Sequence, residues 1–110
     1  MIYEVRTYRL KPGTLDDFVH VMRTQGVPLL RSFGITVVAA GPSLVKEGDW
    51  EEAYIIRAFA DADERDRLEE AFYGSPEWHN GPRNAILERI EHYHTVVIPD
   101  SDLMITWSED

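Results

Sequence analysis

The order of its strand-like and helix-like segments is the feature that most constrains what this chain can fold into. Residues 2–10 alternate in side-chain character, which is typical of a strand with two different faces. Apolar residues recur at helical spacing in residues 15–22 and predict an amphipathic helix with Thr14 as its N-cap. We expect Gly26 and Pro28 to interrupt this helix and a short helical continuation to follow them.

The second half of the chain repeats the alternation of strand and helix. The β-rich runs 35–40 and 53–59 predict the second and third strands. A capping-box-like start at Asp61 opens a second helix, and Gly74 ends it. Residues 91–98 alternate again and predict the fourth strand.

The resulting order, βαββαβ, is the split βαβ or ferredoxin-like pattern. Right-handed crossovers then give a four-stranded antiparallel sheet with both helices on one face. We therefore predict an α+β domain over residues 1–99, followed by a C-terminal tail, residues 100–110. The tail holds an uncharged apolar run, Leu103–Trp107, which we expect to pack on a partner subunit because exposing it to water is costly.

The face of the predicted sheet that points away from the helices has no cover within one chain. The alternation led us to assign five apolar or aromatic residues to this open face: Ile2, Tyr8, Leu10, Val96 and Ile98. Since these side chains cannot all remain in water, we expect a homodimer that closes through the open sheet face.

Composition narrows the range of partners and locations. The chain has 110 residues, 44% hydrophobic and 28% charged, which is typical of a single soluble domain. The absence of cysteine excludes disulfides and thiolate metal sites and fits a reducing cytoplasm. A net charge of −9 argues against nucleic-acid binding and against anionic membranes. We see no signal peptide and no apolar run long enough to cross a bilayer, so we expect a cytoplasmic protein.

The connection between the second helix and the fourth strand is unusually rich in aromatic and hydrogen-bonding side chains. It carries Tyr73, Trp78, Arg83 and Asn84, and we expect His79 to be exposed. In one interpretation Trp78 is a core residue that closes one end of the fold. In the other it forms one wall of a ligand pocket, with polar contacts supplied by Arg83 and Asn84.

Charged residues on the first and third strands form a second candidate site. Glu4, Arg6 and Tyr8 share one face of the first strand, which we take to be the open face, and Arg57 on the third strand can join them. A purely structural ion pair that fixes the strand register is one interpretation. In the other, Arg57 or Arg6 binds a carboxylate or enolate oxygen of a small ligand.

His92 and His94 point to the same side of the fourth strand and can supply two metal ligands. A metal site needs a third or fourth ligand, and Glu4 is the only obvious carboxylate on a neighbouring strand. We therefore predict no metal and no cofactor, with haem binding kept as a third hypothesis. A catalytic histidine here would exchange a proton near neutral pH. No nucleophile elbow, phosphate-binding loop or dinucleotide motif is present in the sequence.

Two stretches of the chain resemble the NIPSNAP family. Residues 2–13 (IYEVRTYRLKPG) resemble the opening strand and turn of that family. Arg57–Phe59, Glu64-Arg65 and residues 72–78 (FYGSPEW) resemble the second half of its bacterial members. The resemblance covers residues 1–99 and implies a dimeric α/β-barrel, a fold shared with several small monooxygenases, isomerases and haem enzymes. For the NIPSNAP-like proteins themselves it implies no settled activity.

Two hypotheses on function follow. The first is a homodimeric protein that binds a small, partly apolar molecule between sheet and helices. Its ligand-binding candidates are Glu4, Arg6, Tyr8, Arg57, Tyr73, Trp78, Arg83 and Asn84. The alternative is a cofactor-independent monooxygenase or isomerase acting on a small enolisable or aromatic substrate. In that case Arg57 would stabilise an enolate-like anion while His92 or His94 moves a proton.

Overall fold

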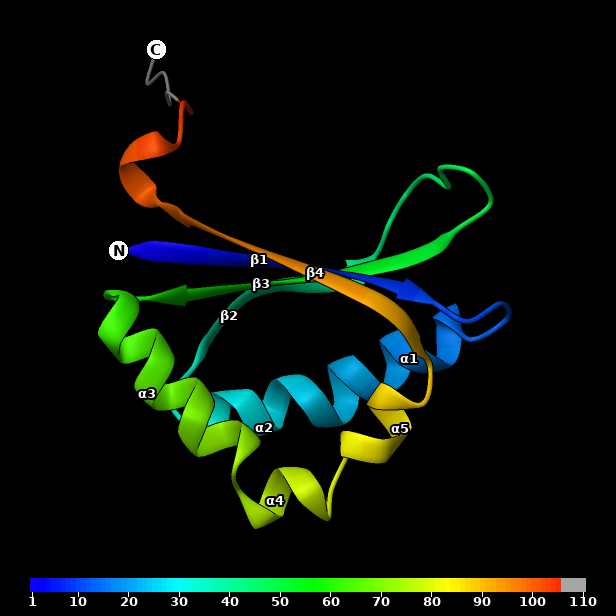
Figure 1. The fold of residues 1–110 in the computed structure, drawn as a ribbon, viewed down its shortest axis with the longest axis horizontal. Coiled ribbons are helices and arrows are strands. Elements are labelled where there is room, and N and C mark those ends of the chain that lie inside the picture. Colours follow the sequence, from blue (N-terminus) through cyan, green and yellow to red (C-terminus); the bar gives the residue numbers. More distant parts are fainter. Residues whose placement is uncertain (106–110) are drawn as a thin grey trace.

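The computed structural model describes residues 1–105, which form one antiparallel sheet with the α-helices packed on one of its faces (Figure 1). The four strands lie in the order β2-β3-β1-β4, so β1 and β3 are central. The strands are β1 (Ile2–Leu10), β2 (Thr36–Pro42), β3 (Glu51–Phe59) and β4 (Ile90–Pro99). The α-helices are α1 (Leu15–Val21), α2 (Val27–Ser32), α3 (Ala62–Tyr73), α4 (Pro76–His79) and α5 (Arg83–Leu87). The predicted ferredoxin-like order is confirmed, and within one chain the sheet is open rather than closed into a barrel.

The first helical segment is continuous, so the predicted interruption at Gly26 and Pro28 is wrong. A π-helical turn, η1 (Met22–Gly26), joins α1 to α2, and Gly26 and Val27 both keep right-handed helical dihedral angles. Pro28 lies in the first turn of α2, where its missing N–H is tolerated. A Cβ atom on Gly26 would lie only 3.1 Å from Met22 Sδ, so glycine allows a close approach here.

The capping residue of one helix is local in sequence, and that of another comes from a distant strand. Asp61 accepts a hydrogen bond from Glu64 N at 2.8 Å at the start of α3, as the capping-box pattern predicts. Thr14, however, makes no side-chain cap on α1. Glu51 of β3 accepts hydrogen bonds from Gly13 N at 2.6 Å and from Leu15 N at 3.2 Å instead. Those backbone donors hold the pKa of Glu51 below its usual value.

The assignment of the faces of β1 is wrong. Glu4, Tyr8 and Leu10 lie under the helices, with exposed fractions of 0%, 5% and 2%, and Ile2 packs against the core. The alternation identifies which residues share a face but not which face the helices cover. Val5, on the other side of β1, pairs with Val96 of β4, so Val96 lies on the open face as predicted.

The core fills the space between the sheet and the helices. Its largest fully buried apolar side chains are Leu10, Phe18, Leu30, Ile35, Ile55, Phe59 and Phe72. Beyond β4, a short 3-10 turn (Asp100–Asp102) leads to an exposed apolar segment that reaches Ile105. Thr106 and Trp107, the rest of the apolar run expected to pack on a partner, lie outside the described residues. Among residues 1–105, no helix has the length and apolar character needed to cross a bilayer.

Candidate functional site

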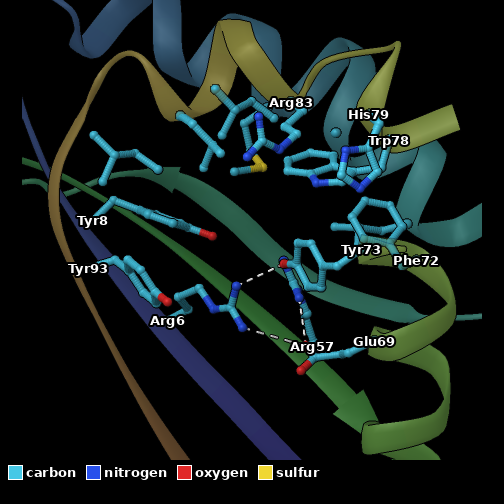
Figure 2. A pocket seen from close by; sticks show the side chains of 16 residues that line it. Arg6, Tyr8, Arg57, Glu69, Phe72, Tyr73, Trp78, His79, Arg83 and Tyr93 are labelled. Carbon is cyan, nitrogen blue, oxygen red and sulfur yellow. Dashed lines mark hydrogen bonds and ion pairs between the residues drawn. The ribbon is translucent and has the colours of Figure 1, made fainter. Parts of the chain in front are cut away.

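A cavity of about 480 Å³ lies between the sheet and the helices (Figure 2). Its volume is in the range of small-molecule sites in proteins. Strands β1, β3 and β4 supply one side of the lining, and the helical segments η1, α2, α3, α4 and α5 supply the other. The two sides differ in chemical character.

Trp78 is central to the apolar side. Ser75 caps α4 by accepting a hydrogen bond from Trp78 N at 3.1 Å, and its own hydroxyl donates to Phe72 O at 2.7 Å. These bonds fix the turn that carries the indole, which lies 5.1 Å from the Phe72 ring and 5.4 Å from the Tyr73 ring, centroid to centroid. Trp78 is only 6% exposed and lines the cavity, so it is both a core residue and a wall of the pocket.

The remaining apolar lining comes from residues far apart in the chain. It consists of Met22, Gly26, Leu30, Phe72, Ile86, Leu87 and Ile90. Met22 and Gly26 belong to the π-helical turn, so the irregular turn faces the cavity directly. His79 and Arg83 complete the lining at the α4 and α5 end.

Polar groups converge on the sheet side of the cavity. The hydroxyls of Tyr8 and Tyr73 and the guanidinium of Arg6 point toward one another in Figure 2. Arg6 Nη1 donates to the Tyr73 hydroxyl at 2.8 Å, and the Arg6 guanidinium lies 5.6 Å from the centre of the Tyr93 ring. The Arg57 guanidinium lies 5.7 Å from the centre of the Tyr73 ring. Hydrogen-bond donors therefore concentrate on the sheet side of the cavity, and His79 and Arg83 add others at the α4 and α5 end.

An ion cluster lies beneath these donors. It consists of Glu4 and Arg6 from β1, Arg57 from β3, and Arg65, Asp66 and Glu69 from α3, where the exposed Asp66 lies 3.2 Å from Arg65 Nη1. Arg57 Nη1 lies 2.7 Å from Glu69 Oε2, and Arg65 Nη2 lies 3.3 Å from Glu69 Oε1. Glu4 accepts a short hydrogen bond from Arg6 and lies 3.4 Å from Arg65 Nε. The cluster thus joins α3 to both central strands.

Two guanidinium groups of the cluster retain donor capacity. Among residues 1–105, the Nε atoms of Arg6 and Arg57 are buried without a hydrogen-bond partner in the protein. Arg57 is 2% exposed, and its Nη1 donates to Glu69. A guanidinium carries five N–H donors, so Nη donors remain beyond the bonds found here, whereas the two Nε atoms have almost no accessible surface. Both arginines line the cavity.

The protonation states follow from burial and neighbouring charge. Burial, opposed by the Arg57 and Arg6 guanidinium groups, raises the pKa of Tyr8 to about 12, so its hydroxyl remains a donor. Burial and then the adjacent Glu4 carboxyl raise the pKa of Glu69 to about 7. Burial opposes ionisation of Glu4 too, but the hydrogen bond with Glu69 and the surrounding guanidinium groups hold its pKa below the usual value.

The structure brings together most of the residues that the sequence suggested. The predicted candidates that line the cavity are Arg6, Tyr8, Arg57, Tyr73, Trp78 and Arg83. Glu4 lies under the cavity in the ion cluster, and Asn84 is exposed and accepts a hydrogen bond from Arg83 at 3.2 Å.

His92 and His94 lie elsewhere. They pair with Arg9 and Thr7 on the open face of the sheet, opposite to the cavity. Neither can exchange a proton with a molecule held between sheet and helices. Within the described part of the chain, no group of three or more His, Asp or Glu side chains is placed to hold a metal ion.

Sequence reasoning missed three residues of the site. Arg65 and Glu69 are spaced i, i+4 on α3, a pattern that usually marks a solvated helix pair. Tyr93 lies between the two histidines and points to the cavity side, where it pairs with Tyr8 across the strands. The alternation of β4 does place Tyr93 opposite to the histidines, but the two faces of the sheet were exchanged, and nothing in the sequence marked Glu69 as buried.

Comparison with known proteins identifies the family of this chain. Residues 3–104 match the family profile described as NIPSNAP. The fold is similar to that of an uncharacterized NIPSNAP domain protein from Burkholderia xenovorans, with 18% identity and a TM-score of 0.80 over 96% of this chain and 100% of that one. It is also similar to a NIPSNAP family protein from Agrobacterium tumefaciens, with 15% identity and a TM-score of 0.80 over 92% of this chain and 93% of that one.

A second Agrobacterium tumefaciens protein, a NIPSNAP family protein with unknown function, shares 29% identity with a TM-score of 0.72 over 94% of each chain. None of the curated proteins compared with this chain matches it. Because the family profile covers nearly the whole sequence, and the solved structures share its fold, this chain belongs to the NIPSNAP family.

Proposed function

We propose that this NIPSNAP protein is a homodimer that binds a small, partly apolar molecule in the cavity between its sheet and its helices. The observation that carries the proposal is the division of the cavity into an apolar side around Trp78 and a donor-rich side around Arg6. Small-molecule sites combine a mostly apolar lining with a few polar groups that orient the ligand. The cysteine-free composition supports the cytoplasmic location expected from the sequence.

A bulky side chain that fills the cavity should weaken the binding of an apolar probe. We expect Met22→Trp to weaken the binding of the neutral fluorescent probe N-phenyl-naphthylamine by about tenfold or more, because the indole would occupy the apolar side. Gln25→Trp, an exposed change in the same π-helical turn, should bind the probe like the wild type. Titration of probe fluorescence measures both affinities, and circular dichroism checks that both variants fold. A wild-type protein that leaves the probe dark would contradict the proposal.

The open face of the sheet supports the homodimer. Its apolar and aromatic residues include Tyr3, Val5, Tyr54, Ile56, Val96 and Ile98. The β2–β3 connection and the C-terminal segment both extend to this side of the sheet, away from the helices (Figure 1). Each carries apolar side chains that are largely exposed in one chain, with Leu44 at 99% and Met104 at 96%. A second copy of the sheet would cover all of these surfaces.

Two neighbouring valines of β4 test the dimer with opposite expectations. Val96 is 47% exposed on the open face, whereas Val97 is 42% exposed and pairs with Glu4 on the helix face. We expect Val96→Arg to give a monomer, because it buries a charge in the interface, and Val97→Arg to remain a dimer. Light scattering at micromolar concentration measures the mass. A monomeric wild type, or two variants of equal mass, would show that the sheet face is not the interface.

The second candidate function, a cofactor-independent monooxygenase or isomerase of an enolisable substrate, is favoured by one observation. Glu69 lines the cavity beside Arg57, and its pKa is raised to about 7, first by burial, so it can exchange a proton near neutral pH. Glu69 would take the role that the sequence suggested for His92 or His94.

A test for enolate formation distinguishes this candidate enzyme from a protein that only binds a small molecule. The enzyme should accelerate exchange of deuterium from solvent into the carbon next to the carbonyl of phenylpyruvate, followed by NMR, by at least about 100-fold over buffer. Glu69→Gln should remove the acceleration, and Glu70→Gln, an exposed neighbour on α3, should keep it. Exchange at the buffer rate in the wild type would eliminate this candidate and leave the binding function.

A further inference from the structure

Two tyrosine hydroxyls enter the cavity from different parts of the fold. Tyr8 lies on the central strand β1, and Tyr73 is the last residue of α3. Both line the cavity, and their hydroxyls point toward one another in Figure 2. Burial raises the pKa of Tyr8 to about 12, and the nearby Tyr73 adds to the rise, so the Tyr8 hydroxyl keeps its hydrogen at neutral pH.

The hydrogen atoms of these two hydroxyls meet no acceptor within the described chain. Arg6 Nη1 donates to the Tyr73 oxygen at 2.8 Å, so the Tyr73 hydrogen must point elsewhere. The Arg6 guanidinium is also the polar neighbour of the Tyr8 hydroxyl, and a guanidinium offers donors only. Among residues 1–105, no oxygen accepts a hydrogen bond from either tyrosine. Both hydroxyls can therefore donate to a molecule in the cavity.

The charges beside the hydroxyls favour a neutral ligand group. The three arginines of the ion cluster face three carboxyl groups, so their charges are balanced. Glu69, one of these carboxyl groups, lines the cavity beside Arg57. A ligand carboxylate on the sheet side would add a negative charge to this balanced group, and burying a charge without a counter-charge is costly.

Two converging donors narrow the neutral group further. A carbonyl oxygen has two lone pairs and no hydrogen, so it can accept from both tyrosines at once. An alcohol oxygen also accepts, but its hydrogen then needs a further acceptor on a side of the cavity where donors prevail. A hydrocarbon would leave both hydroxyls without a partner, which is costly in a buried place. The opposite wall, around Trp78, is apolar and fits an apolar body.

We infer that the cavity binds a small neutral carbonyl compound, such as an aryl ketone, whose carbonyl oxygen accepts hydrogen bonds from Tyr8 and Tyr73 and whose apolar body lies against Trp78. The inference rests on the proposed binding function and adds the class of ligand and its orientation. Arg6 contributes by holding the Tyr73 oxygen, which directs the hydrogen of that hydroxyl toward the ligand.

Three planar probes of one shape test the class of ligand in the wild-type protein. Acetylnaphthalene, isopropenylnaphthalene and naphthoate, each substituted at the same ring position, carry a ketone, a methylidene group and a carboxylate. Displacement of N-phenyl-naphthylamine, followed by its fluorescence, measures the three affinities at neutral pH. We expect the ketone to bind about 10- to 30-fold more tightly than the hydrocarbon, the size of two neutral hydrogen bonds, and more tightly than the carboxylate.

The contrary results separate this inference from the proposed function. If N-phenyl-naphthylamine binds but the ketone displaces it no better than the hydrocarbon does, the carbonyl class is wrong and the binding function stands. Tighter binding of naphthoate than of the ketone would contradict the neutral class. If N-phenyl-naphthylamine does not bind at all, the proposed function itself fails.

Variants then locate the carbonyl group. Tyr8→Phe and Tyr73→Phe each remove one hydroxyl and should weaken the ketone about two- to tenfold without weakening the hydrocarbon. Tyr3→Phe, on the opposite face of β1, should keep the full preference for the ketone. The NMR signal of the bound carbonyl carbon should lie downfield of that of the free ketone, and less so in Tyr8→Phe. A preference that survives in both cavity variants, or that is lost only in Arg83→Gln, would overturn the assignment.

Discussion

The buried carboxylate of Glu4 is the constraint on which the rest of the structure depends. Glu4 lies in the middle of the central strand β1 and is 0% exposed, so its charge needs partners within the fold. Arg6 supplies one from the same strand, and Arg65 supplies another from α3. Glu69 adds contacts to Arg57 and Arg65, which ties α3 to β3 as well. Helix α3 can therefore pack on the sheet in only one position, because any displacement would separate buried groups of opposite charge.

The position of α3 fixes where the aromatic residues at its C-terminal end lie. Tyr73 is the last residue of the helix, and the ion cluster places its hydroxyl on Arg6. The Ser75 cap turns the chain immediately afterwards and brings Trp78 against Phe72 and Tyr73. On the other side, Gly26 in the π-helical turn leaves room for the side chains of Met22, in the same turn, and of Ile86 on α5. Both features line the cavity, through Trp78 on one side and through Met22 and Gly26 on the other.

Local patterns predicted the fold well. The alternation of β1, the capping pattern at Asp61 and the order of elements depend on neighbouring residues, and all appear as expected. The sequence also pointed to six residues that line the cavity, namely Arg6, Tyr8, Arg57, Tyr73, Trp78 and Arg83. The predictions that were wrong depended on contacts between residues far apart in the chain. The N-terminus of α1 is capped by Glu51, which lies far along the chain.

The choice of sheet face failed for a related reason. Glu4 and Arg6 are residues that usually face solvent, and only their partners on α3 make burial possible. With the faces exchanged, the two histidines of β4 move to the open side and Tyr93 moves to the cavity. Glu69 became visible as a site residue only once α3 was placed on the sheet, since its sequence neighbours are those of an ordinary charged helix.

The stability of Glu69→Gln as a function of pH tests the ion cluster most directly. Burial and Glu4 raise the pKa of Glu69 from 4.5 to about 7, so the folded protein holds this proton more tightly than the unfolded chain does. The contribution of this proton to the free energy of unfolding is therefore complete below pH 4.5 and is lost as the pH rises to about 7. Urea unfolding should show the wild type losing on the order of 1–3 kcal/mol over that interval relative to Glu69→Gln. Parallel stability curves for the two proteins would contradict a buried, charge-coupled Glu69 in the ion cluster.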